Sequence, residues 1–180
     1  TYDSYWQRCN TADRHAEIKV PAFQQCGWFD PYTASGFRYF NGMTQNGATP
    51  EARTQQRIMV GPWSHEVPEG TSLGDMDFGE SAPVDMREEN KRWFDWQLKG
   101  VKGDLSDGPP IRLFVTGSNQ WRYEHQWPLD RTRWTPYYLS SGGNANSLAG
   151  DGMLCSDPPG NEPPDHFEYD PKEPVPTRGG

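Results

Sequence analysis

The chain has 180 residues and a formal net charge of −8 at pH 7, with 17 Lys and Arg against 25 Asp and Glu. This balance offers no basic face to a nucleic acid or an anionic membrane, so the sequence argues against binding to either. No stretch approaches the ~20 apolar residues that span a bilayer, which argues against a transmembrane helix. The 19 Gly and 17 Pro disfavour a helical bundle, while eight Trp, eight Tyr and eight Phe leave enough apolar area for a core. Three Cys without a CxxC spacing and four scattered His predict no metal and no cofactor.

The first hundred residues alternate between predicted strands and predicted helices. Their apolar runs and turn residues predict a strand over 18–29, a helix over 31–45, a strand over 56–60 and a helix over 83–99. Strands that alternate with helices in this way indicate an α/β fold with a parallel sheet.

The character of the sequence changes after Gly100. A segment rich in turn residues is followed by short apolar runs at 111–116 and 134–139 and by shorter pieces near Met153 and Phe167. Short strands separated by turn signals are typical of a β-sandwich or jelly roll. The sequence therefore predicts an α/β part over 1–103 and an incomplete β jelly-roll domain over 104–180.

An acidic residue and a histidine follow the two predicted strands directly. Asp30 ends the first strand in GWFD, and His65 follows the second in GPWSH. Ligands bind at the carboxyl ends of parallel strands, and neighbouring strands lie about 4.8 Å apart, so the two side chains can converge. A carboxylate on Nδ1 of a histidine leaves Nε2 to take a proton from a nucleophile. Two plainer interpretations stay open: Asp30 before Pro31 as a helix cap, and His65 as a hydrogen-bonded loop residue.

The sequence lacks a nucleophile to complete this pair. No G-x-S-x-G occurs in the 180 residues, and none of Ser35, Ser64 and Ser118 is predicted in a strand-turn-helix elbow. A catalytic triad would therefore need a serine from outside this sequence.

Aromatic residues surround the candidate pair and recur in the β part. Trp28 and Trp63 each stand two residues before a candidate, where core packing and a pocket wall are both compatible with the pattern. Trp121, Trp127 and Trp134 suggest either packing or a sugar-binding platform.

Several motifs follow one another in a specific order: GWFD, QRIMVGPWSH, RWFDWQLKG, PPIRLFVTGSNQWRYEHQWP, YYLSSGGNANSLAGDGMLC and FEYDPKEPVPTRGG. Together they make nearly the whole chain resemble the cocaine-esterase-like and X-Pro dipeptidyl-peptidase-like serine hydrolases. In that family an α/β-hydrolase domain with a helical cap precedes a C-terminal jelly roll. The resemblance implies that Asp30 is the triad acid, that His65 is the base, and that Tyr32 lies near the acyl pocket. With Tyr32, Trp28 and Trp63 are the candidate substrate contacts.

The resemblance also implies that the chain is a fragment. The nucleophilic Ser and a Tyr hydroxyl of the oxyanion hole would precede Thr1, and the final PVPTRGG would stand partway through the jelly roll. The implied substrate is a small ester or amide or a short X-Pro peptide, cleaved through a Ser-Asp-His triad. The alternative is a non-catalytic binding or structural module in which the β part carries the function.

Overall fold

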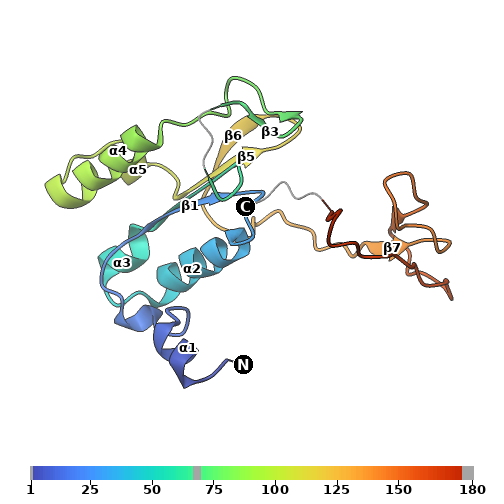
Figure 1. Ribbon diagram of the computed structural model, residues 1–180. Coiled ribbons are helices and arrows are strands. Elements are labelled where there is room, and N and C mark those ends of the chain that lie inside the picture. Colours follow the sequence, from blue (N-terminus) through green and yellow to red (C-terminus); the bar gives the residue numbers. More distant parts are fainter. Residues whose placement is uncertain (1, 67–69, 176–180) are drawn as a thin grey trace. The chain divides into compact units, whose positions relative to one another are not determined.

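The structure is a computed structural model that describes residues 2–66 and 70–175 (Figure 1). It divides into two compact units, the first reaching to Asp130 and the second starting at Arg131, and each is described by itself. Residues 176–180, the end of the PVPTRGG segment that is expected partway through a jelly roll, lie outside the described residues.

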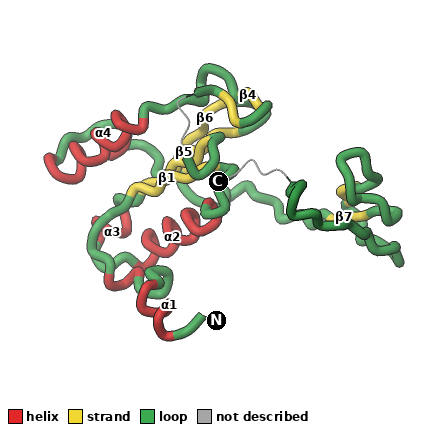
Figure 2. Tube along the Cα trace, in the orientation of Figure 1, coloured by secondary structure: helices red, strands yellow, loops and turns green. Residues whose placement is uncertain are grey.

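Helices and strands alternate through the first unit, as the sequence predicts (Figure 2). The helical elements are α1 (Ser4–Cys9), the 3-10 helix η1 (His15–Glu17), α2 (Thr33–Asn46), α3 (Pro50–Thr54), α4 (Met86–Lys99) and α5 (Asp104–Asp107). The strands are β1 (Phe23–Gly27), β2 (Arg57–Gly61), β3 (Ser72–Leu73), β4 (Met76–Asp77), β5 (Ile111–Val115) and β6 (Gln120–Glu124).

The main sheet has the strand order β1-β2-β5-β6. Strands β1, β2 and β5 are parallel, and β6 pairs with β5 in the antiparallel direction. The register places Gly27 opposite Gly61, so β1 and β2 end side by side. The parallel sheet expected for the first hundred residues is therefore present, and the residues that follow β1 and β2 leave the sheet at the same edge.

Strand β5 differs from the sequence expectation, which assigned 111–116 to the second domain. It pairs with β2, with Ile111 opposite Ile58, and continues the α/β sheet. The reason is burial on both faces: Ile111, Leu113 and Phe114 are all at most 2% exposed. An apolar run of this kind is typical of a central strand in a parallel sheet and not of a half-exposed sandwich strand.

The core lies on both faces of this sheet. On one face, Phe37 and Phe40 of α2 pack against Ile58, Val60 and the apolar side chains of β5. A second cluster joins Phe78 and Ala82 to Phe114. Because neighbouring side chains of a strand point to opposite faces, Leu113 and Phe114 serve different clusters.

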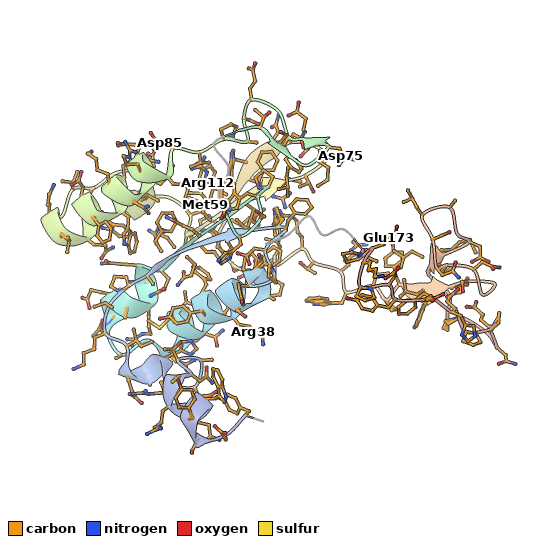
Figure 3. All side chains as sticks on the ribbon, viewed as in Figure 1. Arg38, Met59, Asp75, Asp85, Arg112 and Glu173 are labelled. Carbon is orange, nitrogen blue, oxygen red and sulfur yellow. The ribbon has the colours of Figure 1, made fainter. Side chains whose placement is uncertain are left out.

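The ends of α4 follow from local sequence. Asp85, at the start of the helix in Figure 3, accepts hydrogen bonds from the backbone N–H groups of Arg87 and Glu88 at 3.0 Å each. Asp85 is the N-cap residue, so the helix begins at Met86, three residues after the predicted start at Pro83. Gly100 adopts the left-handed conformation, with φ of 69°, and ends the helix where the sequence predicts.

The second unit contains a small antiparallel sheet of β7 (Tyr138–Ser140) and β8 (Met153–Cys155). Carboxylates fasten its turns: Asp151 accepts hydrogen bonds from the backbone of Gly142 at 3.0 Å and of Asn144 at 3.2 Å. In residues 2–66 and 70–175, no helix has the length and apolar composition needed to cross a membrane.

Candidate functional site

Asp30 and His65, which the sequence predicts as partners, lie next to each other. Nδ1 of His65 is 3.2 Å from Oδ2 of Asp30, within hydrogen-bonding reach. This is the arrangement in which a carboxylate orients an imidazole and favours the tautomer with its proton on Nδ1.

The backbone pairing of β1 and β2 continues beyond the strands and brings the two residues together. The N–H of Trp28 donates to the carbonyl of Gly61 at 2.9 Å, and the N–H of Phe29 donates to the carbonyl of Trp63 at 3.1 Å. The two segments therefore run in contact up to the residues that carry the acid and the histidine.

The carboxylate of Asp30 divides its two oxygens between two partners. Oδ1 accepts a hydrogen bond from the backbone N–H of Tyr32 at 2.8 Å, and Oδ2 faces His65. The hydroxyl of Thr33 donates to the carbonyl of Gly27 and lies 3.0 Å from that of Asp30, which fastens the turn between β1 and α2. Asp30 therefore has a local structural role near the start of α2 and also contacts the histidine. The interpretation of Asp30 as the helix cap is wrong, because α2 begins at Thr33 and its N-cap residue is Tyr32.

The other side of the imidazole is open. The side chain of His65 is 61% exposed, whereas that of Asp30 is 10% exposed. Within the described part of the chain, Nε2 of His65 makes no hydrogen bond, and no serine hydroxyl is bonded to the ring. The ring of Tyr32, which is 64% exposed, meets His65 edge-on with 5.7 Å between centroids. The ring of Tyr32 is therefore an exposed neighbour of the imidazole.

The two tryptophans of the candidate site differ in their surroundings. Trp63 is 2% exposed, and its ring lies 5.8 Å from that of Trp121 between centroids, so almost no surface remains for a ligand. Trp28 lines an open cavity of about 530 Å³ with Phe37 and Trp127, and its indole N–H donates to the carbonyl of Phe114 at 2.6 Å.

Two glycines make this arrangement possible. A Cβ atom on Gly27 would come within 2.1 Å of the carbonyl oxygen of Trp63, and a Cβ atom on Gly61 within 2.0 Å of its ring. Neither gap admits a methyl group. Sequence reasoning missed these positions, although the Gly before Trp28 and the Gly two places before Trp63 were visible in CGWFD and GPWSH.

Cys26, the residue before the last in β1, has a perturbed thiol. Burial and the nearby negative charge of Asp30 raise the pKa of Cys26 to about 11. Its thiol is therefore protonated near neutral pH and is a poor nucleophile.

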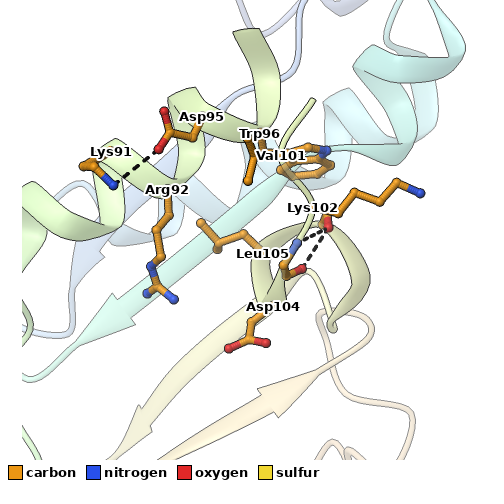
Figure 4. A pocket seen from close by; sticks show the side chains of 10 residues that line it. Lys91, Arg92, Asp95, Trp96, Val101, Lys102, Asp104 and Leu105 are labelled. Atoms are coloured by element: carbon orange, nitrogen blue, oxygen red, sulfur yellow. Dashed lines mark hydrogen bonds and ion pairs between the residues drawn. The ribbon is translucent and has the colours of Figure 1, made fainter. Parts of the chain in front are cut away.

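A separate cavity lies between α4 and α5. It has a volume of about 220 Å³, and Lys91, Arg92, Trp96 and Leu105 are among its lining residues (Figure 4). Asp95 in the same wall forms an ion pair with Lys91 at 3.3 Å. In residues 2–66 and 70–175, no group of three or more His, Cys, Asp or Glu side chains is placed to hold a metal ion.

Comparison with known proteins gives this geometry a context. Residues 1–66 match the family model of X-Pro dipeptidyl-peptidase (S15 family), and residues 104–177 match that of the X-Pro dipeptidyl-peptidase C-terminal non-catalytic domain. Cocaine esterase from Rhodococcus sp. (strain MB1 Bresler) is 36% identical over 181 residues, which cover 99% of this chain and 30% of that protein. These matches support the assignment of the chain to this hydrolase family.

Solved structures show the same fold as this chain. An α-amino acid ester hydrolase superimposes with a TM-score of 0.62 and 25% identity, over 97% of this chain and 28% of its own. An aminopeptidase from the marine sediment archaeon Thaumarchaeota archaeon gives a TM-score of 0.66 at 24% identity, over 98% of this chain and 28% of its own. The chain thus spans 30% of the length of the curated relative that it matches and combines an α/β-hydrolase-like part with a segment of the C-terminal non-catalytic domain.

Proposed function

We propose that Asp30 and His65 are the acid and the base of a serine hydrolase triad whose nucleophilic serine lies outside this sequence. The observation that carries the proposal is the 3.2 Å contact between Oδ2 of Asp30 and Nδ1 of His65, at the carboxyl ends of two parallel strands. The order of acid before histidine along the chain is that of α/β-hydrolases. The absence of a G-x-S-x-G from the 180 residues is the reason to seek the serine elsewhere.

The first step forms an acyl-enzyme. Nε2 of His65 takes the proton of the serine hydroxyl as its Oγ attacks the carbonyl carbon of the substrate. Asp30, bonded to Nδ1–H, stabilises the imidazolium that results. The tetrahedral adduct collapses, the bond to the alkoxide or amine breaks, and the leaving group takes the proton from Nε2.

The second step releases the acid. A water molecule gives a proton to Nε2 of His65 while the water oxygen attacks the acyl carbon. The bond between the acyl carbon and the serine oxygen then breaks, and His65 returns the proton to that oxygen. The open position of Nε2 in the structure suits both transfers, because each donor approaches the same nitrogen.

The proposed substrates are small acyl esters, amides or X-Pro peptides. The names of the relatives support this range, since they include an esterase, an amino acid ester hydrolase and a dipeptidyl-peptidase. Tyr32, exposed beside His65, is proposed to contact the acyl group, and Trp28 to line its neighbourhood. Trp63 is left out of the substrate contacts because it is buried.

We further propose that the second domain is the first part of a β jelly roll over 104–180. The small sheet of β7 and β8 and the match of 104–177 to the C-terminal domain of the family support this assignment. In this assignment β5 and β6 lie within the sequence range of the second domain, but their backbones pair within the α/β sheet of the first unit.

A serine-directed fluorophosphonate probe tests the proposed function in the complete enzyme. The unaltered enzyme should be labelled on one serine outside residues 1–180, and the variant His65→Ala should be labelled at least roughly 100-fold more slowly, because the serine loses its base. His125→Ala, which changes a histidine on the first unit away from the site, is the matched control and should label normally. Equal labelling of the His65→Ala variant would refute the assignment of the base.

A further inference from the structure

We propose that strands β5 and β6, from the segment matched to the non-catalytic domain, position the Asp30–His65 pair. They do so through the tryptophans that stand two residues before the acid and two residues before the histidine. This inference rests on the proposed function and adds positioning residues to it.

The acid side of the pair is tied to β5. The indole N–H of Trp28 donates to the carbonyl of Phe114 at 2.6 Å, across 86 positions of sequence. Phe114 itself is 1% exposed and pairs with Trp121 between the antiparallel strands β5 and β6, so this carbonyl is a rigid acceptor. The backbone between Trp28 and Asp30 is a tight turn, in which the N–H of Asp30 donates to the carbonyl of Gly27 at 3.0 Å. A shift of Trp28 would therefore move the carboxylate.

The histidine side of the pair rests on β6. The ring of Trp63 packs on that of Trp121, with 5.8 Å between centroids and 49° between planes. Trp121 is held in turn, because its indole N–H donates to the carbonyl of Ser81 at 2.7 Å and the guanidinium of Arg112 lies 4.3 Å over its ring. Arg112 is anchored to the buried carboxylate of Glu89 on α4 at 2.9 Å. A continuous set of contacts thus runs from α4 through β5 and β6 to the residue two places before His65.

His65 depends on this support because little else holds it. Its side chain is 61% exposed, and the contact with Asp30 is the hydrogen bond that the described structure gives to its ring. At 3.2 Å this contact is near the long end of the range for N–H···O bonds. A displacement of about 1 Å would break it, and misplacements of that size cost on the order of 100-fold in rate.

The test compares tryptophan variants in the complete enzyme. Trp121→Leu removes the ring on which Trp63 packs, and Trp28→Phe keeps an aromatic ring but removes the donor to Phe114. Each should lower kcat by roughly 10- to 100-fold, because the variants disturb the reacting groups. For Trp121→Leu, which lies outside the proposed substrate contacts, KM should change by less than about twofold. Trp121→Phe, which keeps a ring beside Trp63, should restore part of kcat.

Trp93→Phe is the matched control for loss of packing. Trp93 is 7% exposed and packs on Phe23, at the opposite end of β1 from Asp30. This variant should lower Tm as the others do but leave kcat unchanged. The ring ¹⁵N signals of His65 give a readout that stability alone does not move: Trp121→Leu should shift the imidazole from the Nδ1–H tautomer towards a mixture, and Trp93→Phe should not.

The outcomes separate this inference from the proposed function. His65→Ala is measured in the same assay, and if it stays active the proposed function fails. If His65→Ala is inactive while Trp121→Leu and Trp28→Phe keep kcat within twofold, the positioning inference alone fails. An equal loss of kcat in Trp93→Phe would also overturn it. If Trp121→Leu does not fold, Trp28→Phe and Trp121→Phe decide by the same criteria.

Discussion

Asp30 shows how one side chain can serve the fold and the chemistry together. Its oxygens face different partners, the backbone N–H of Tyr32 and the imidazole of His65. The sequence presented capping and catalysis as rivals because Asp before Pro fits a helix start whatever the other oxygen does. Only the register of β1 on β2, which sequence pattern does not give, shows that the second oxygen is available to the histidine.

Cys26 gives a prediction about pH at the same scale. Its pKa rises from about 9 to about 11 in the folded protein, because of burial and the nearby charge of Asp30. The unfolded chain therefore loses this proton first, and the free energy of unfolding should fall by about 2–3 kcal/mol as pH rises from about 9 to about 11. Urea denaturation across that window checks this, with Cys26→Ala as the control.

The result is the difference in the free energy of unfolding between the unaltered protein and the Cys26→Ala variant, because the other groups titrate equally in both. A difference that stays constant with pH would contradict the account. Alkylation supplies an independent measure: at pH 8.5 the exposed Cys9 should react with iodoacetamide much faster than Cys26.

At the scale of the elements, the ends of β1 and β2 depend on glycines that leave room for Trp63. Gly27→Ala would place a methyl group against the carbonyl oxygen of Trp63, which belongs to the backbone and cannot move aside. We expect the free energy of unfolding to fall by about 1–3 kcal/mol, the usual cost of overpacking. Urea denaturation of the chain checks this.

Gly70→Ala is the matched control, because this glycine is exposed and a Cβ atom there meets no atom of the described residues within 4 Å. It should change the free energy of unfolding by no more than roughly 0.5 kcal/mol, the usual range for an exposed position. Equal stability of Gly27→Ala and Gly70→Ala would show that the close approach of β1 and the Trp63 carbonyl is not needed.

The elements of the first hundred residues were predictable because their signals are local. The run before Asp30 and the capped helix from Asp85 to Gly100 carry their own start and stop residues. The place of β5 was not predictable in this way. Its neighbour is β2, about fifty residues earlier, and the turn-rich segment before it reads as a domain linker although it joins α4 to a strand of the same sheet.

The contact between Asp30 and His65 could be expected from the sequence, whereas the contacts of the two tryptophans beside them could not. Asp30 and His65 follow from strand ends and from the resemblance, both of which are visible in the sequence. Phe114 and Trp121 contact the neighbouring tryptophans only through pairing across the sheet, a long-range property that spacing does not encode.

At the scale of the whole molecule, the segment matched to a non-catalytic domain supplies half of the main sheet. Strands β5 and β6 lie within 104–177, yet they complete the sheet whose other two strands lead to Asp30 and His65. The division of the family into a catalytic and a non-catalytic part therefore does not coincide with the compact units of this structure, where the first unit reaches to Asp130.

The most direct test of the proposed triad is the turnover of an activated ester by the complete enzyme and by its Asp30→Asn variant. The asparagine keeps the shape of the side chain and the acceptor for Tyr32 but removes the charge that orients and stabilises the imidazole of His65. The account predicts that kcat falls by roughly 10⁴-fold while the protein stays folded. A folded Asp30→Asn enzyme with kcat within about threefold of the unaltered enzyme would contradict it.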